Sequence, residues 1–355
     1  MNGTILIYGA TGYTGKLIAK AAADQGARPI LAGRNLAKVN AVARPLGLKA
    51  RAFDLGDPNR LDAAIKDVSV VLCVAGPFSA TSRPMADACL RNRVHYLDIT
   101  GEIDVFEALA ARDAEAMARG VMLLPGVGFD VVPSDCLAAH LKRRLPDAND
   151  LKLYLSLSDD MSRGTAKTVI EAIAAGTRLR RNGRIVTRDW AAEGSCDFGE
   201  GEKPTTQVSW GDVATAFHST GIPNIEVYFD ASPTIRAFAR TPWFVKSFFG
   251  LGFMQSLLKF HVDSLPEGPS EVARRTGRAV LVGQARNKMG QTVRSRVTTP
   301  EGYSLTAATA FDAARRVAAG DIKPGFQTPS RVFGSDYILS FDGVTREDLN
   351  SDPAP

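Results

Sequence analysis

The first fifteen residues, MNGTILIYGATGYTG, constrain the fold of this chain more than any other stretch. Thr4 to Tyr8 is a short β-branched and apolar run, typical of a fully buried strand. Three evenly spaced glycines follow at once, and the next apolar residues repeat at helical spacing. Strand, glycine turn and helix in this order predict a dinucleotide-binding unit, in which backbone N–H groups approach a pyrophosphate. The predicted pyrophosphate loop consists of Gly9, Ala10, Thr11, Gly12, Tyr13, Thr14 and Gly15.

A different phosphate-binding motif, the P-loop of nucleotide triphosphatases, is excluded at the same place. That motif requires a glycine, four further residues, a Gly-Lys pair and then Ser or Thr. Here the pair Gly15-Lys16 has Ala10 in the position of the first glycine and Leu17 after it. The glycine turn is therefore interpreted as a dinucleotide loop.

A charged residue after the second predicted strand indicates which dinucleotide binds. Pro29 to Ala32 is the strand, and Arg34 follows it, 19 residues after Gly15. A dinucleotide fold places at about this distance the group that recognises the adenosine ribose. An acid there would bind a 2′-hydroxyl, whereas the donor fork of an arginine matches a 2′-phosphate. Arg34 therefore predicts NADP(H) rather than NAD(H), and the alternative is that Arg34 is a surface loop residue.

The same strand–helix alternation continues to about residue 125 and predicts an α/β fold with a parallel Rossmann-type sheet. Ligands of such sheets bind beyond the carboxyl ends of the strands. Asp54 is accordingly predicted near the adenine, and the segment Ala75-Gly76-Pro77-Phe78 near the nicotinamide ribose. The remaining predicted strands of this sheet are Lys49–Phe53, Ser69–Ala75, Val94–Asp98 and Val121–Leu124.

After residue 145 the pattern changes to that of an α+β domain. Leu151 to Leu157 alternates apolar and polar residues, as in a half-buried antiparallel strand. Tyr303 to Ala319 has a clear helical pattern and is expected to return to the first domain. The predicted division is 1–145 for the NADP-binding domain, 146–300 for the α+β domain, and 301–355 for the returning helix and tail. Further predicted strands are Arg184–Trp190, Thr205–Ser209, Ile225–Phe229, Arg278–Arg286 and Thr292–Thr298.

Composition sets the broad class of protein. A chain of 355 residues with 45% hydrophobic and 23% charged residues is typical of a globular protein with two domains. A net charge of +5, spread along the chain, is accounted for in part by an anionic cofactor and does not require nucleic acid. The four cysteines form no CxxC pair and have no histidine at metal-ligand spacing, so we expect buried free thiols, no metal and a cytoplasmic location. The N-terminus lacks the basic region of a signal peptide.

The segment 241–260 is unusually rich in aromatic residues, but lysines and a glutamine interrupt it. Three interpretations are open. It forms a buried or dimer-forming pair of helices, it makes a peripheral membrane contact, or it lines the site of a long acyl substrate. The first is favoured.

Polar residues at the carboxyl ends of the later strands are the candidates for catalysis. A hydride-transfer site must hold the substrate and stabilise or protonate the atom where charge develops. Tyr96, Glu102 and Asp130 are the predicted catalytic residues, although Glu102 has the alternative of opening the next helix. Lys167, in the motif SRGTAKT, is a further candidate proton donor or a solvated helix residue. No Tyr-x-x-x-Lys pair occurs, which counts against a standard short-chain dehydrogenase.

The motifs GATGYTG, AGRN, AGPF, HYLDITGE and GVGFDVVPSD resemble those of the saccharopine dehydrogenase-like reductases. The branch that includes bacterial trans-acting enoyl reductases is the most similar. The resemblance covers roughly residues 1–145 and resumes more weakly at SRGTAKT and at Lys323 to Pro329. It implies an N-terminal Rossmann domain that binds NADP(H), an inserted substrate domain and a homodimer.

Together these observations predict an NADPH-dependent oxidoreductase that reduces a polarised double bond in an enoyl thioester, an imine or a carbonyl compound. The alternative is an NADPH-binding regulator or lipid-surface scaffold without turnover. The expected partner is thus a small-molecule or acyl-thioester substrate. The basic run Arg178 to Arg188 either grips a carboxylate or is a solvated face.

Overall fold

The computed structural model describes residues 3–156, 176–230 and 267–349, and these form two compact units. The first unit comprises Met1–Val132 and Tyr303–Phe333, and the second comprises Pro133–Gly302 and Gly334–Pro355. No helix within the described ranges is long and apolar enough to cross a membrane. The aromatic segment 241–260 and the motif at 162–168 lie outside the described residues, so their predicted roles remain predictions.

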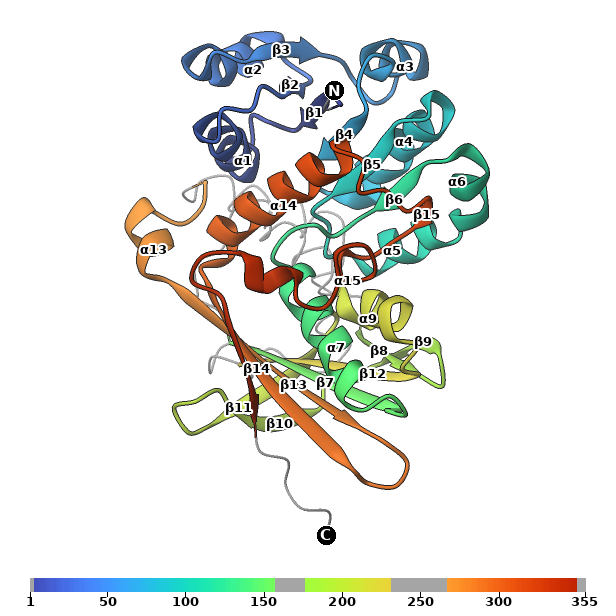
Figure 1. The fold of residues 1–355 in the computed structure, drawn as a ribbon, viewed down its shortest axis with the longest axis vertical. Coiled ribbons are helices and arrows are strands. Elements are labelled where there is room, and N and C mark those ends of the chain that lie inside the picture. The colour runs from blue at the N-terminus through green and yellow to red at the C-terminus, as the bar shows by residue number, and fades with distance from the viewer. Residues whose placement is uncertain (1–2, 157–175, 231–266, 350–355) are drawn as a thin grey trace. The chain divides into compact units, whose positions relative to one another are not determined.

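The first unit is built on a seven-stranded sheet in which every neighbouring pair of strands is parallel. The strand order is β15-β6-β5-β4-β1-β2-β3, so the order reverses between β1 and β4 (Figure 1). This confirms the predicted α/β class with a Rossmann-type sheet. The strands are β1 (Ile5–Tyr8), β2 (Ile30–Gly33), β3 (Lys49–Ala52), β4 (Val70–Cys73), β5 (His95–Asp98), β6 (Met122–Leu124) and β15 (Gly325–Phe326).

Helices cover both faces of this sheet, because its central strands are apolar on both sides. Along β1, Ile5 and Ile7 belong to one core cluster, and Leu6 and Tyr8 belong to the other. The first cluster contains residues of α1 (Tyr13–Asp24), α2 (Leu36–Ala43) and α14 (Gly302–Ala318). The second contains residues of α3 (Pro58–Ile65), α4 (Phe78–Asn92), α5 (Ile103–Ala110) and α6 (Asp113–Arg119). A short 3-10 helix η1 (Arg44–Leu46) and α15 (Pro329–Phe333) complete the unit.

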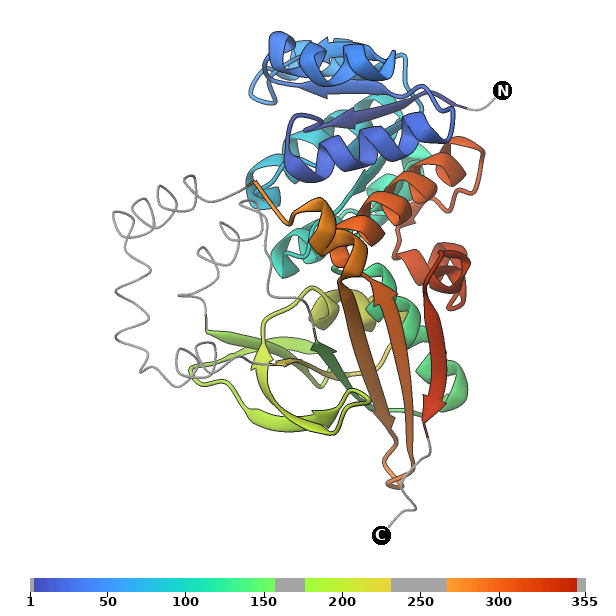
Figure 2. The same ribbon diagram turned by 90° about the vertical axis from the view of Figure 1, so that its left-hand side faces the viewer.

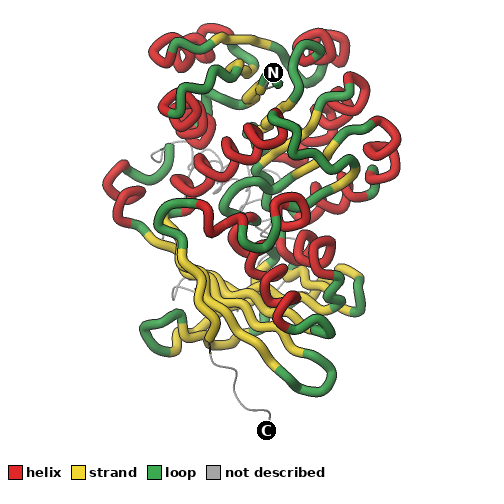
Figure 3. Tube along the Cα trace, viewed as in Figure 1, coloured by secondary structure: helices red, strands yellow, loops and turns green. Residues whose placement is uncertain are grey.

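The second unit contains a nine-stranded mixed sheet (Figures 2 and 3). Its main path runs β10-β11-β12-β7-β13-β14-β16, and β8 and β9 branch from β12. The predicted antiparallel setting of β7 is correct toward β13, whereas toward β12 the pairing is parallel. The strands are β7 (Asp150–Ser156), β8 (Thr177–Arg181), β9 (Arg184–Arg188), β10 (Glu193–Asp197), β11 (Glu202–Val208), β12 (Asn224–Asp230), β13 (Arg278–Arg286), β14 (Thr292–Pro300) and β16 (Thr345–Leu349). Within the described residues its helices are α7 (Val132–Arg144), α9 (Asp212–Thr220), α13 (Glu271–Thr276) and the 3-10 helix η2 (Tyr337–Ser340).

This second sheet is strongly curled. Gly199, in the turn between β10 and β11, lies against the guanidinium of Arg296 on β14, although these strands are far apart in the strand order. On the inner face Tyr154 and Tyr228 stack at 5.2 Å, and they share a core cluster with Phe198. On the other face α7 packs against Gly283 of β13, where a β-carbon would meet leucine side chains of the helix.

The division of the chain differs from the predicted boundaries at two places. Helix α7 groups with the second unit, because it packs on the curled sheet, whereas the sequence placed it in the first domain. The segment 301–355 is divided between the units: α14 and β15 belong to the first, and β16 pairs with β14 in the second. The polar residues 345–349, expected to be tail, form an edge strand because they pair antiparallel with β14, where Arg296 and Glu347 also form a cross-strand ion pair.

Candidate functional site

The glycine loop lies at the point where the strand order reverses, between β1 and β4. Gly9 has a φ of +91°, and a β-carbon on it would lie 2.8 Å from the backbone nitrogen of Ala75. A β-carbon on Gly15 would lie 2.4 Å from the carbonyl oxygen of Gly9. Only glycine therefore allows the loop to close on itself, on the start of α1 and on the end of β4.

Gly12 differs from Gly9 and Gly15, because it has room for a side chain. It is exposed, precedes α1, and would bring a β-carbon no closer than 3.5 Å to any other atom. No side chain caps the N-terminus of α1, and its first turn contains no acid. The open position and the uncapped N–H groups fit a pyrophosphate. The other loop residues line this turn: Ala10 is buried, and Thr11, Tyr13 and Thr14 are half-buried.

Arg34 follows strand β2, and Asp54 follows the adjacent strand β3. The charges of both side chains affect the pKa of the Tyr8 hydroxyl group. Burial is the main cause that raises the pKa of Tyr8 to about 12; Cys73 and Asp54 raise it further and Arg34 lowers it. The Arg34 side chain is exposed, and in the described part of the chain no carboxylate pairs with it. One Asp54 oxygen accepts a hydrogen bond from the Gly56 amide at 2.8 Å, which closes the turn after β3. A free arginine at the end of β2 suits a 2′-phosphate.

The segment Ala75 to Phe78 joins β4 to α4 beside the glycine loop, and it contains a cis peptide bond between Gly76 and Pro77. The Thr81 hydroxyl donates to the carbonyl oxygen of Ala75 at 2.6 Å and holds the turn from within α4. This turn is therefore fixed at the switch point, where the nicotinamide half of a dinucleotide lies.

The carboxylate of Glu102 caps the first turn of α4. One oxygen accepts from the Phe78 amide at 2.8 Å, and the other accepts from the Ser79 amide at 2.7 Å. These amides have no intrahelical partner, and a carboxylate also suits the positive end of the helix dipole. Glu102 precedes α5, as the sequence suggested, but its side chain reaches a different helix. The geometry supports Glu102 as a residue that positions the turn at 76–78.

Tyr96 is completely buried, and its hydroxyl donates to Asp98 at 2.6 Å. Asp98 also accepts from the amides of Thr100 and Gly126 and thereby ties the end of β5 to the loop after β6. Burial raises the pKa of Asp98 to about 6, although the three hydrogen bonds that it accepts each lower it. Burial also raises the pKa of Tyr96 well above the ordinary value of a tyrosine. This environment supports a positioning role for Tyr96 rather than contact with a substrate.

Asp130 lies in the loop after β6 and is half-buried beside Gly101, which follows β5. A β-carbon on Gly101 would lie 3.0 Å from an oxygen of Asp130, so the absence of a side chain there makes room for this carboxyl group. Burial raises the pKa of Asp130 to about 6. A carboxyl group that is still partly protonated at neutral pH is able to act as a general acid. Of the three predicted catalytic residues, Asp130 has the environment that best fits the role.

Two threonines of α14 hold the loop that carries Asp130, and the sequence analysis assigned them no function. Thr306 accepts from the Phe129 amide at 2.9 Å, and the Thr309 hydroxyl donates to the carbonyl oxygen of Val127 at 2.9 Å. Both threonines are buried on the helix face that packs on the sheet. The sequence does contain a signal for this role, because the two threonines are spaced three residues apart on an otherwise apolar face of the helix.

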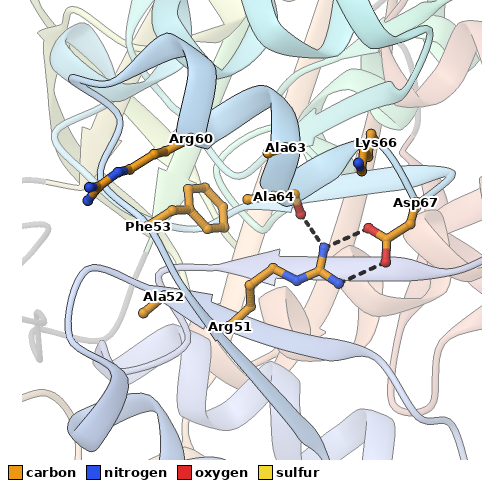
Figure 4. A pocket seen from close by; sticks show the side chains of 8 residues that line it. All are labelled: Arg51, Ala52, Phe53, Arg60, Ala63, Ala64, Lys66 and Asp67. Carbon is orange, nitrogen blue, oxygen red and sulfur yellow. Dashed lines mark hydrogen bonds and ion pairs between the residues drawn. The ribbon is translucent and has the colours of Figure 1, made fainter.

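A surface hollow of about 480 Å³ lies at the outer edge of the sheet, between β3 and α3 (Figure 4). Arg51 lines one end, where its guanidinium binds Asp67 with two hydrogen bonds of 2.7 and 2.9 Å. Arg60 lines the hollow near Phe53 and points away from that pair. The hollow is separate from the glycine loop, and none of the predicted site residues lines it.

The fold and the loop geometry define a dinucleotide-binding domain, and comparison with known proteins specifies which kind. Residues 5–124 match the family model of the saccharopine dehydrogenase NADP binding domain. This confirms the resemblance seen in the sequence, and it confirms NADP(H) as the nucleotide for which the domain family is named. Residues 5–124 of this chain are therefore similar to the saccharopine dehydrogenase NADP binding domain.

Curated relatives agree with this assignment. A trans-acting enoyl reductase of Mycobacterium leprae (strain TN) is 35% identical over 149 residues, which cover 40% of this chain and 36% of the relative. The trans-acting enoyl reductase of Mycobacterium tuberculosis (strain ATCC 25618 / H37Rv) is 31% identical over 198 residues, or 52% of this chain and 47% of the relative. The chain thus matches less than half of the length of either relative.

The fold of the whole chain is also found in a solved structure. Apo histidine-tagged saccharopine dehydrogenase (L-Glu forming) from Saccharomyces cerevisiae superimposes with a TM-score of 0.61 at 14% identity. The match covers 98% of this chain and 100% of the yeast chain. At this identity the similarity concerns the fold, which is a Rossmann-type domain together with a second domain built on a mixed sheet.

Proposed function

We propose that this chain is an NADPH-dependent oxidoreductase that reduces a polarised double bond. The observation that carries the proposal is the glycine loop at the switch point of the sheet. Gly9 and Gly15 close it without room for a side chain, and Gly12 leaves it open toward a ligand. The NADP binding domain family and the reductases among the relatives support the same activity.

In this proposal each part of the cofactor has its own protein groups. The loop from Gly9 to Gly15 holds the pyrophosphate with backbone N–H groups. Arg34 binds the 2′-phosphate with a charge-assisted hydrogen-bond fork. The turn at 76–78, held by Glu102 and Thr81, bounds the nicotinamide end. Bound NADPH would supply a hydride, and the protein must then supply the proton that completes the reduction.

We assign that proton to Asp130. Its pKa of about 6 leaves a useful fraction of the carboxyl group protonated at neutral pH. The bonds from Thr306 and Thr309 to its loop, and the contact with Gly101, restrict where the carboxyl group lies. Asp98 and Tyr96 have an indirect role in this proposal: their hydrogen bonds hold the loops after β5 and β6 in place relative to each other.

The experiment that tests the proposed activity is a substrate screen with NADPH. Purified protein is mixed with NADPH and, in turn, with an enoyl thioester such as crotonyl-CoA, a cyclic imine and a ketone. We expect one class to be reduced, and the enoyl thioester is tested first because the relatives are named enoyl reductases. The absorbance of NADPH reports turnover, and isolation of the reduced product confirms it. Tight NADPH binding without oxidation in any class would contradict the proposal and favour a non-catalytic NADPH-binding protein.

A further inference from the structure

Among the strands that the structure describes, the hairpin β8–β9 leaves an open edge on the second sheet. Strand β8 pairs with β12 on one side and with β9 on the other, whereas β9 pairs with β8 alone among the described strands. An edge strand presents unpaired N–H and C=O groups to any extended chain that approaches. The sequence of β9, Arg-Ile-Val-Thr-Arg, contains no acid, no proline and no glycine.

Large side chains are exposed along this edge. Val186, at the centre of β9, is 37% exposed, and Trp190, two residues beyond the strand, is 59% exposed. The guanidinium of Arg188 lies 5.2 Å from the centre of the Trp190 ring. An exposed tryptophan beside an arginine is typical of the residues that dominate binding interfaces.

The positive charge of this edge is only partly neutralised by the protein itself. Arg181 of β8 lies directly opposite Arg184 of β9, and Arg181 forms an ion pair with the buried carboxylate of Glu226. No described carboxylate pairs with Arg184 or Arg188. Since side chains alternate along a strand, Arg184, Val186 and Arg188 share one face of β9, in the order positive, apolar, positive.

This pattern disfavours a second copy of β9, paired symmetrically, as the natural occupant. Two copies that pair antiparallel and symmetrically about Val186 would place Arg184 of one chain opposite Arg188 of the other, twice. Like charges directly opposite one another destabilise a sheet. An occupant with acids at both of those positions and an apolar residue between them would meet opposite charges instead.

We propose that β9 is a docking edge for an extended acidic segment of a partner protein, which adds to the sheet as an antiparallel strand. The segment has the pattern acidic-x-apolar-x-acidic. Its two acids lie opposite Arg188 and Arg184, and its central apolar side chain packs on Val186. Main-chain hydrogen bonds supply affinity, and the charges set the register.

The test uses a fluorescein-labelled peptide with the core Glu-Thr-Val-Thr-Glu, flanked by Gly-Ser, and a second peptide in which lysines replace both glutamates. Fluorescence anisotropy measures binding to the full chain. We expect the acidic peptide to bind and the lysine peptide not to bind. In the variant Arg184→Glu/Arg188→Glu, affinity for the acidic peptide should fall roughly tenfold or more, and the lysine peptide should now bind. The expected affinity also decreases as salt is added.

The control variant is Lys288→Glu, which changes the charge of an exposed lysine in the turn between β13 and β14 and should leave binding of the acidic peptide unchanged. NADPH affinity and melting temperature are measured for every variant, so that a misfolded protein is recognised. Failure of the wild type to bind the acidic peptide would overturn the proposal, as would equal binding by the double variant. Binding of a single-stranded oligonucleotide or of anionic phosphatidylserine vesicles at this edge, without binding of the peptide, would also overturn it.

Discussion

Asp130→Asn is expected to lower turnover by roughly 100-fold to 10,000-fold while NADPH affinity stays close to that of the wild type. The asparagine keeps the shape of the side chain beside Gly101 but has no proton acidic enough to transfer to a substrate. Steady-state turnover with the substrate found in the screen and a separate NADPH titration measure the two quantities. The matched control is Asp24→Asn, which alters an exposed acid of α1 that forms an ion pair with Lys20.

The pH dependence of turnover is a second test of the role of Asp130. Because the pKa of Asp130 is about 6, the protonated form predominates below pH 6, and turnover should fall by about tenfold per pH unit well above it. The same shift affects stability: a raised pKa means that the folded state loses stability as the pH rises through 6. Asp130→Asn should therefore be more stable than the wild type at pH 8, by up to roughly 3 kcal/mol, and show little difference below pH 4. Unchanged turnover or a wild-type pH profile in the variant would remove Asp130 from the mechanism.

The second large effect is expected at Gly15. Its replacement by alanine would place a β-carbon 2.4 Å from the Gly9 oxygen and 2.8 Å from the Cα atom of Ala10, and both of these are backbone atoms with little freedom to move. We expect Gly15→Ala to separate the loop from α1 at a cost of about 2 kcal/mol or more, which lowers the melting temperature by roughly 4–8 °C. NADPH affinity should fall at least about 100-fold, because the N–H groups no longer converge on one phosphate position.

Gly12→Ala distinguishes the loss of stability from the loss of NADPH affinity that we expect together in Gly15→Ala. A β-carbon at Gly12 meets only an ordinary contact of 3.5 Å, so the melting temperature should stay near that of the wild type. It faces the predicted pyrophosphate, however, so NADPH affinity should still fall. Thermal unfolding and NADPH titration of both variants decide the matter. Wild-type affinity in Gly15→Ala would show that the glycine loop is not the cofactor site.

The first unit follows closely from its sequence, because its signals are local. Apolar runs and the glycine turn specify most of the six predicted strands, and all six lie within a residue or two of β1 to β6; β3, with the sequence Lys-Ala-Arg-Ala, is the strand without an apolar run. Asp57 caps α3 by accepting from the Asn59 and Arg60 amides, with a proline at the first helical position, as the Asp-Pro pair predicts. The seventh strand, β15, has two residues, which is too short for any periodicity to reveal.

The second unit was harder to predict, because its partners are distant in the sequence. Strand β16 has an ordinary polar sequence and becomes a strand only by pairing with β14. The strand β8 and the helix α9 were missed for a different reason: arginines and threonines give a weak local signal, even though β8 pairs with its neighbour β9 across a two-residue turn. Among site residues, Glu102 lies beyond the end of β5 as predicted, whereas Tyr96 is the second residue of that strand. The direction of both side chains depends on α4 and Asp98, which no spacing along the chain encodes.

The central claim, that this domain binds NADPH through the glycine loop and Arg34, is tested most directly by titrating wild type and Arg34→Ala with NADPH and NADH. We predict that the wild type prefers NADPH, and that Arg34→Ala binds NADPH about 10-fold to 100-fold more weakly while NADH affinity hardly changes. Equal binding of both nucleotides by the wild type, or an unchanged preference in Arg34→Ala, would contradict the account.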